Sequence, residues 1–517
     1  MNIKEAKEAI ELMVQEYLTK DKYGDYAIPA HQQRPIFMVG APGIGKTAIM
    51  EQIASDLDVG LVAYTMTHHT RQSACGFPVV SEVSVGGKSV KVTEYTMSEI
   101  IAKVYKTIEE SGKKEGILFL DEINCLSETL APAMLEFLQY KKFGNWQLPE
   151  GWVLVTAGNP PQFNKSVKEF DVATQDRLRI ISIDADFGVW KEYAINKGVH
   201  PAIIGFLTMN EGWFYKITSS ASSGKEFATA RGWEDLSTTI KTYESLGFDI
   251  NEDLIGQFIK CPEAVQKFGV YYRLFKKYRM DYGISDIISG NVSDVVIGKA
   301  KSAKFDERLA ILSMLTDATG ALSKDYVQTF KALSLAARPL RKIKKQLSYV
   351  NVHDEIIAAK ADIEKDMEKK KAASALSMEE KNVDVEACRF LAKYADAALE
   401  SKTPDAASVF KKVKAAFTKD SKKLSSDGKG VSLALQSAFK FIASSWGDDQ
   451  EMILWVTQIT TTAATMMFIA QNGCDEYYKY NGLIKVTENK ERENLINEIS
   501  LFLEDSDEAQ EKAAASV

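Results

Sequence analysis

The most informative segment of the chain reads Gly40-Ala41-Pro42-Gly43-Ile44-Gly45-Lys46-Thr47. It fits the pattern G-x-x-x-x-G-K-[ST], and it lies between an apolar run typical of a buried strand and a helical pattern that begins at Ala48. Glycines let the backbone curl so that its N–H groups and the helix N-terminus face phosphate oxygens. In such a loop Lys46 supplies charge to the β and γ phosphates of a nucleotide, and the Thr47 hydroxyl is a Mg²⁺ ligand. The segment therefore predicts a nucleotide phosphate site that extends to Ala48.

Five short apolar runs are predicted to be strands of one sheet. Helical patterns separate most of them, at 48–57, 98–110 and 128–140. Strands that alternate with helices over about 180 residues predict a parallel sheet covered by helices on both faces. The predicted strands are Ile36–Val39, Leu61–Thr65, Ile117–Leu120, Trp152–Thr156 and Ile180–Ile183.

Two carboxylates directly follow the third predicted strand. Asp121 and Glu122 come after Leu120, so both lie at the carboxyl edge of the sheet, where the ligand sites of α/β proteins form. We expect Asp121 to hold Mg²⁺ through water, and Glu122 to polarise an attacking water molecule. An apolar run that ends in two acids is also common at solvated strand ends, and the phosphate loop is what favours a catalytic role.

Two polar residues near the next strands each allow two interpretations. Asn159 either caps the turn before two prolines or places its amide beside the γ-phosphate and the attacking water. Arg177, which precedes the last strand, either pairs with local acids or reaches the nucleotide of a neighbouring subunit.

Two segments interrupt the strand–helix alternation. Val83–Val92 alternates apolar and polar residues around Gly86-Gly87, which is a hairpin signal. A second excursion, Lys141–Pro149, lies just before the strand that begins at Trp152.

The order of these motifs resembles the AAA+ superfamily, and in particular its MoxR-like and dynein-related branch, over roughly residues 20–300. By this resemblance Gly40–Thr47 is the Walker A motif, Ile117–Glu122 is Walker B, Asn159 is sensor 1 and Arg177 is the arginine finger. The family usually has Phe after that arginine, whereas this chain has Leu178 and then Arg179, so both arginines remain candidates for the finger.

The resemblance also implies a lid and a ring. Arg231 matches the sensor 2 arginine, although the family often has Pro where this chain has Ala230; otherwise Arg231 is a helix-surface charge beside Trp233. The family forms rings, usually of six subunits, that bind ATP or ADP with Mg²⁺ between neighbours and hydrolyse ATP. The two excursions resemble the family's helix-2 insert, at about 79–95, and its hairpin before sensor 1, which would face the pore or the substrate.

The expected fold class is therefore α/β, with an additional all-α region. We expect an AAA+ αβα P-loop NTPase core with a parallel sheet at 1–185, a helical lid domain at 186–300, and an all-helical C-terminal region at 301–517. Within that last region we predict breaks at a charged stretch, Glu364–Asn382, and at a Ser/Lys/Gly linker, Thr418–Gly430. We expect the acidic, Ala-rich tail Glu504–Val517 to be disordered.

The composition bears on the class of protein, on its cellular compartment and on a possible membrane span. The 64 basic and 71 acidic side chains give a formal charge of −7, which argues against a general phosphate-neutralising surface for nucleic acid. Five scattered cysteines without a C-x-x-C pair argue against a disulfide framework and favour a reducing cytoplasm. Met452–Ala470 is 19 residues without a charge, yet its threonines and acidic flanks favour a buried core helix over a membrane span.

Three functions compete. The first is a chaperone-like motor that remodels or activates a protein partner, in that family often one with a von Willebrand A domain; the acidic charge and the long helical region favour it. The second is a nucleic-acid-linked NTPase of restriction or helicase-associated type, for which the candidate surfaces are Lys411–Lys414 with Phe410 and Phe417, and Tyr271–Arg279. The third is a nucleotide-gated scaffold with little turnover, which the presence of Lys46, Asp121 and Glu122 disfavours.

Overall fold

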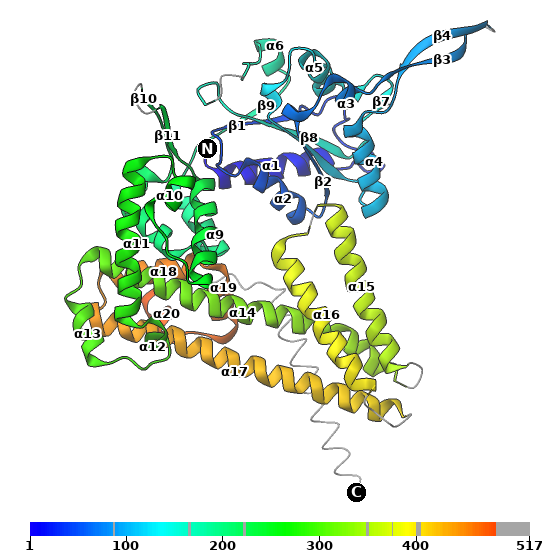
Figure 1. Cartoon of the computed structure of the whole chain (residues 1–517). Coiled ribbons are helices and arrows are strands. Elements are labelled where there is room, and N and C mark those ends of the chain that lie inside the picture. Colours follow the sequence, from blue (N-terminus) through cyan, green and yellow to red (C-terminus); the bar gives the residue numbers. More distant parts are fainter. Residues whose placement is uncertain are drawn as a thin grey trace. The chain divides into compact units, whose positions relative to one another are not determined.

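The computed structural model describes residues 1–85, 88–163, 167–220, 224–347, 351–374, 376–399 and 405–481 (Figure 1). The chain forms two compact units. The first comprises Met1–Val189 together with Asp366–Ser377, and the second comprises Trp190–Lys365 together with the described residues from Met378 onward. The predicted division of the helical part at residue 300 stays a prediction, because both of its sides belong to the second unit.

Five parallel strands form the central sheet of the first unit, in the order β2-β5-β8-β1-β9. β1 (Ile36–Gly40) lies between β8 (Trp152–Gly158) and β9 (Arg179–Ile183), and β2 (Gly60–Thr65) is the edge strand beside β5 (Gly116–Asp121). All five predicted strands are confirmed to within about two residues at their ends. The α/β class is confirmed with them.

Helices cover both faces of this sheet. Ile36 and Met38 point to the face packed by α1 and α2, whereas Phe37 points to the face packed by α4 and α5. This alternation follows the two-residue period of a strand, and burial on both faces explains why each strand is a continuous apolar run. The helices of the unit are α1 (Ile3–Leu18), α2 (Lys46–Asp56), α3 (Arg71–Cys75), α4 (Glu99–Ser111), α5 (Ala131–Tyr140) and α6 (Val172–Gln175).

Two antiparallel pairs extend from the first unit. β3 (Pro78–Val85) pairs with β4 (Lys88–Tyr95), and Figure 1 shows this hairpin projecting away from the sheet; its turn, Gly86-Gly87, lies outside the described residues. β6 (Lys142–Phe143) and β7 (Trp146–Gln147) form a much shorter pair. Both pairs lie where the sequence predicts excursions from the strand–helix alternation.

A short segment from the helical half of the sequence belongs to the first unit. The backbone N–H of Leu61 in the edge strand β2 donates a hydrogen bond of 2.9 Å to the carbonyl of Ala373, which is fully buried. Edge strands present unpaired backbone groups. Asp366–Ser377 therefore covers part of the sheet edge.

The second unit is mainly helical. Its helices up to residue 301 are α8 (Pro201–Met209), α9 (Ala230–Leu246), α10 (Glu252–Phe258), α11 (Pro262–Tyr282), α12 (Ile284–Ile288) and α13 (Asp294–Lys301), preceded by α7 (Phe187–Lys197) at the boundary. The later helices are α14 (Phe305–Lys345), α15 (Val352–Ala372), α16 (Met378–Leu399), α17 (Ala406–Trp446), α18 (Gln450–Thr461), α19 (Ala463–Asn472) and α20 (Asp475–Asn481). α15 leads into the segment that belongs to the first unit.

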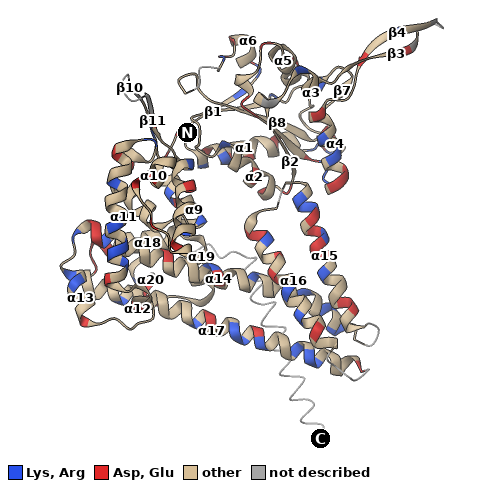
Figure 2. Cartoon of the chain, viewed as in Figure 1, with Lys and Arg blue, Asp and Glu red and all other residues tan. Residues whose placement is uncertain are grey.

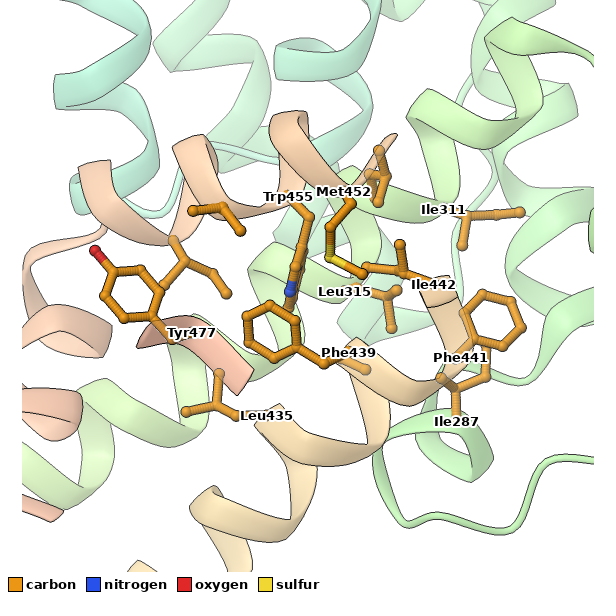
Figure 3. Close-up of a cluster of buried hydrophobic side chains, with 14 of the residues drawn as sticks. Ile287, Ile311, Leu315, Leu435, Phe439, Phe441, Ile442, Met452, Trp455 and Tyr477 are labelled. Atoms are coloured by element: carbon orange, nitrogen blue, oxygen red, sulfur yellow. The ribbon is translucent and has the colours of Figure 1, made fainter. Parts of the chain in front are cut away.

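The main core of the second unit joins helices far apart in the sequence. Phe439 of α17 and Trp455 of α18 meet edge to face at 5.9 Å between ring centroids, and Leu315 of α14 lies beside them (Figure 3). Tyr477 of α20 closes the same cluster. The apolar stripe that includes Leu435, Phe439 and Ile442 is therefore core, whereas Leu433 is half exposed.

The two predicted breaks in the C-terminal region have different outcomes. Thr418–Gly430 is not a linker, because it lies inside the 41-residue helix α17. Phe417, Leu424 and Val431 recur seven residues apart and are buried, as is Gly428, so the Ser and Lys residues and Gly430 between them occupy the exposed side of a helix. The break predicted at the charged stretch Glu364–Asn382 is confirmed, since α15 ends at Ala372 and α16 begins at Met378, although the rest of the stretch is helical.

A small sheet in the second unit escaped prediction. β10 (Lys216–Ser220) and β11 (Gly224–Ala228) form an antiparallel pair directly before α9. The prediction of purely helical structure from Asp186 onward was wrong at this point. Its only sequence signal is a Ser/Gly-rich turn between two short segments, which is weaker than the signal of the Gly86-Gly87 hairpin.

The uncharged segment Met452–Ala470 forms two helices rather than the single helix expected. α18 and α19 meet at Thr462 with a bend of 91°, and Met452, Trp455 and Phe468 are buried in the core. Asn196 fixes the bend, because its amide donates to the carbonyl of Thr461 and accepts from the N–H of Ala463. Among the described residues no single helix has the length and apolar character to cross a membrane, and only this bent pair passes that test jointly. The predicted tail Glu504–Val517 lies outside the described residues.

Candidate functional site

The phosphate loop connects β1 to α2 at the carboxyl edge of the sheet. Gly43 and Gly45 have φ values of 77° and 98°, a left-handed conformation that glycine adopts without strain. α2 begins at Lys46 and has no side-chain cap at its N-terminus. A loop of this shape offers backbone N–H groups and the positive end of a helix dipole to an anion. Gly40–Ala48 thus has the geometry of a phosphate site.

Lys46 joins the loop to the neighbouring strand. Its ammonium donates hydrogen bonds to the carbonyls of Gly40 (2.7 Å) and Ala41 (2.9 Å) and to Oδ1 of Asn159 (2.9 Å). Only 8% of the residue is exposed. The structure therefore brings together Lys46 and Asn159, 113 residues apart in the sequence, at the tips of β1 and β8.

Thr47 and Asp121 also meet at this edge. The Thr47 hydroxyl donates a hydrogen bond of 3.0 Å to Oδ2 of Asp121, at the end of β5. The other carboxylate oxygen, Oδ1, accepts from the backbone N–H of Glu122 at 2.9 Å. A hydroxyl and a carboxylate are the hard oxygen ligands that Mg²⁺ prefers, so this pair fits the ion that the sequence predicts.

Glu122 adopts an unusual backbone conformation for a residue with a side chain. Its φ is 56°, and its carboxylate accepts a hydrogen bond of 2.8 Å from the hydroxyl of Thr67, which follows β2 in the 3₁₀ turn Met66–His68. Left-handed non-glycine residues are uncommon and are often found at functional sites. The sequence analysis missed Thr67, because only the strand order β2-β5 places the two residues side by side.

Asn124 is a second residue that the sequence analysis missed. It lies in the 3₁₀ turn Ile123–Cys125, is 7% exposed, and donates a hydrogen bond of 2.8 Å from Nδ2 to the carbonyl of Asn159. Its position three residues after Asp121 was visible in the sequence, but its contact with the tip of β8 was not. Asp121, Glu122 and Asn124 together make the turn after β5 the centre of this site.

The two candidate finger arginines have different environments. Arg179 lies in β9, where its guanidinium donates to Glu16 at 2.7 Å and to the Tyr17 hydroxyl at 3.3 Å and stacks over the Tyr17 ring. The Arg177 side chain is exposed. Within the described part of the chain, the only interaction of its guanidinium is electrostatic: it helps to lower the pKa of Asp171, which the two hydrogen bonds from Thr174 lower more. Arg177 is therefore the arginine whose side chain is available to another subunit.

Arg231 lies in the second unit, at the start of α9. Thr229 caps this helix, and the Arg231 side chain is exposed. Trp233 instead points into the core and donates from Nε1 to the carbonyl of Trp213 at 3.0 Å. A cation in the first turn opposes the helix dipole, and no hydrogen bond or ion pair of this guanidinium is found among the residues described. The Arg231 side chain therefore makes no hydrogen bond or ion pair among the described residues that would stabilise the fold.

The surfaces proposed for nucleic acid lack fully exposed aromatic rings, and Tyr278 is half-buried. Phe410 and Phe417 are buried in the core shared by α14, α16 and α17, and Tyr271, Tyr272 and Phe275 are buried against α8 and α9. Figure 2 shows basic and acidic side chains interspersed along α15, α16 and α17. Stacking on bases requires exposed rings, so these segments do not form a stacking platform.

A family model matches part of the first unit. Residues 35–178 match the model of the AAA domain, dynein-related subfamily, which confirms the predicted resemblance for this part of the chain. No curated protein matches the chain.

Among solved structures, the RuvB Holliday junction branch migration motor of Thermotoga maritima is similar over 50% of this chain and 68% of its own, with 15% identity and a TM-score of 0.27. A point mutant of the same RuvB protein is similar over 48% of this chain and 67% of its own, with 14% identity and a TM-score of 0.28. At these scores the likeness carries no argument about function.

Proposed function

We propose that this chain, whose residues 35–178 are of the dynein-related AAA type, is a Mg²⁺-dependent ATPase that remodels a protein partner. The observation that carries the ATPase proposal is the hydrogen bond between Thr47 and Asp121. It unites two oxygen ligands from two separate motifs directly beside the phosphate loop. With Glu122 next in the chain, the site combines a place for the metal, a general base and a phosphate cradle.

Each residue has a distinct role in this proposal. The loop from Gly40 to Thr47 and the start of α2 at Ala48 bind the phosphates, and Lys46 exchanges its carbonyl partners for phosphate oxygens. Mg²⁺, held by Thr47 and Asp121, would neutralise charge on the phosphates. Glu122 orients and deprotonates water, and Asn159 donates its amide toward the γ-phosphate. The Lys46–Asn159 contact supports this arrangement, because it shows that both side chains reach one place.

In this proposal two arginines, one from a neighbouring subunit and one from the lid, complete the site. Arg177 would reach the nucleotide of the neighbouring subunit in a ring, as its exposure and the internal contacts of Arg179 suggest. Arg231 would sense the nucleotide from the lid. A ring of six subunits in the cytoplasm is the assembly we propose.

The exposed apolar side chains of the hairpins support a protein partner. Phe77, Val79, Val80 and Val90 are all at least 44% exposed along β3 and β4 or at their base, and Trp146 of β7 donates a hydrogen bond to the Tyr95 carbonyl. Exposed apolar side chains of this size are a feature of protein interaction sites. A von Willebrand A domain is the partner class that we propose. Among the described side chains of the hairpins, Lys91 pairs across the strands with Glu82, which is not the basic surface that nucleic acid requires.

The test of the ATPase proposal is Glu122→Gln. We expect this variant to bind a fluorescent ATP analogue as the parent does and to lose at least about a hundredfold in turnover. Glu109→Gln, an exposed glutamate on α4, is the matched control and should leave turnover unchanged. Equal turnover in Glu122→Gln and parent would refute the site, and negligible turnover in the parent would instead favour the nucleotide-gated scaffold.

A second measurement distinguishes a protein partner from a nucleic-acid partner. ATPase activity is followed while single-stranded DNA, duplex DNA or a purified von Willebrand A domain protein is added. We expect no stimulation by either DNA. Steep stimulation by DNA, falling with salt, would move the assignment to the nucleic-acid-linked class.

A further inference from the structure

We propose that Asn124 is a positioning residue for hydrolysis, which acts by holding Asn159 in register with Lys46. This inference rests on the proposed ATPase function and assigns a role to a residue outside its expected motifs. Asn124 comes from the turn after β5, Asn159 from the tip of β8, and Lys46 from the phosphate loop.

A continuous path of hydrogen bonds connects the three residues. Asn124 Nδ2 donates to the Asn159 carbonyl at 2.8 Å, and Asn159 Oδ1 accepts from Lys46 Nζ at 2.9 Å. The first bond fixes the backbone of Asn159, and the second is made by its side chain. Asn124 therefore controls the direction of the Asn159 amide without itself reaching Lys46.

The fit between Asn124 and β8 depends on Gly158. A Cβ added at Gly158 would lie 2.4 Å from Asn124 Oδ1 and 2.6 Å from its Cγ, so the carboxamide rests directly on the glycine backbone. Any side chain at residue 158 would displace Asn124. The sequence Gly158-Asn159 thus provides both the space for Asn124 and the carbonyl to which it bonds.

The Asn124 amide also carries an energetic cost that packing alone does not explain. Its Oδ1 atom is buried and has no hydrogen-bond partner among the described residues. A buried unpaired acceptor is unfavourable, and an apolar side chain of similar size would avoid it. An apolar residue could not donate the hydrogen bond that Asn124 Nδ2 makes to the Asn159 carbonyl.

A second bond links Asn124 to the segment that leads to Arg177. The Asn124 carbonyl accepts from the backbone N–H of Lys168 at 2.9 Å. The turn after β5 thereby holds both the tip of β8 and the start of the path to the proposed finger. Displacement of Asn124 should affect the catalytic step more than nucleotide binding.

The experiment compares Asn124→Asp with the parent in steady-state ATP hydrolysis and in binding of a fluorescent ATP analogue. Aspartate keeps the size of the side chain but removes the donor and repels the Asn159 carbonyl. We expect kcat to fall about tenfold, while KM and the dissociation constant change less than about twofold. Asn291→Asp, an exposed site on the second unit, introduces the same charge and should change nothing.

A double-mutant cycle identifies the route of the effect. In the Asn159→Ala background, Asn124→Asp should cost less than about twofold, because its target side chain is already gone. A full tenfold loss in that background, an unchanged kcat in the single variant, or a proportional loss of nucleotide affinity would overturn the inference. If Asn124→Asp does not fold, Asn124→Ser takes its place in the same double-mutant cycle with Asn159→Ala.

Glu122→Gln, assayed in parallel, separates this inference from the proposed function. If Glu122→Gln retains full turnover, the ATPase site itself is wrongly assigned. If Glu122→Gln abolishes turnover and Asn124→Asp does not reduce it, only the positioning role fails.

Discussion

The hydroxyl of Thr67 donates a hydrogen bond of 2.8 Å to Oε2 of Glu122, although 55 residues separate them in the sequence. The bond ties the carboxylate that we propose as the general base to the turn that follows the edge strand β2. A carboxylate that accepts such a bond is fixed in direction. Thr67 therefore restrains Glu122 in the conformation that the structure shows.

Thr67→Val should release this restraint. We expect basal ATPase turnover to rise a few-fold, because the Glu122 carboxylate regains freedom to turn toward the attacking water. Nucleotide affinity should not change, since among the described residues Thr67 makes no hydrogen bond to the phosphate loop and donates to Glu122 instead. Thr65→Val, on an exposed residue at the end of β2, is the control and should behave as the parent. A fall in turnover would mean that Thr67 holds Glu122 in its productive position.

Arg177 and Arg179 should separate function from stability. Arg177→Ala is expected to lose most ATPase turnover in the assembled ring without a change in the free energy of unfolding, because its side chain is exposed. Arg179→Ala should lower the free energy of unfolding by about 1 kcal/mol, through loss of the half-exposed pair with Glu16 and of stacking on Tyr17. ATPase assays and urea unfolding of both variants provide the measurements.

Mixed rings test whether the Arg177 side chain acts across a subunit interface. Arg177→Ala subunits keep an intact phosphate loop, and Lys46→Ala subunits keep an intact finger, so mixing two inactive proteins should restore turnover at interfaces that combine both. Mixtures that stay inactive, although rings form, would place Arg177 in its own subunit's site instead.

Lys141 should make stability depend on pH. It is 4% exposed, its ammonium donates to Gln33 Oε1 at 3.0 Å, and burial lowers its pKa from 10.5 to about 8. Between these two pH values the unfolded chain binds more protons than the folded one, so the free energy of unfolding rises with pH across that window. The full shift corresponds to about 3 kcal/mol. Below pH 8 both states are charged and this contribution is constant.

Urea unfolding at pH 7.5 and pH 9.5 measures this dependence. Lys141→Met removes the titrating group, so the gain in stability at the higher pH should be smaller in this variant than in the parent. Lys142→Met, at the exposed neighbouring residue, should keep the parental gain. Equal gains in parent and Lys141→Met would show that the Lys141 pKa is not lowered.

The sequence predicted the parts of the fold in which one segment carries its own signal. The strands of the parallel sheet are buried on both faces and read as apolar runs, and the phosphate loop is local in sequence. Thr67 and Asn124 carry no such signal, since their roles arise only where neighbouring strands bring distant turns together. Composition also misled the prediction at Thr418–Gly430, because Ser, Lys and Gly are tolerated on the exposed side of a long helix whose buried residues recur at Phe417, Leu424 and Val431.

Glycine substitutions in α17 test directly whether residues 418–430 form a helix rather than a linker. A Cβ at Gly430 would meet nothing within 4 Å, whereas a Cβ at Gly428 would lie 2.9 Å from the Tyr326 ring. Because alanine is favoured over glycine in a helix interior, Gly430→Ala should raise the free energy of unfolding by about 0.5–1 kcal/mol. Gly428→Ala should gain less or lose stability, since the Tyr326 ring must shift. If 418–430 were a linker, both substitutions would change the free energy of unfolding by the same small amount. A difference between Gly430→Ala and Gly428→Ala in urea unfolding is therefore the evidence that one continuous helix crosses this segment.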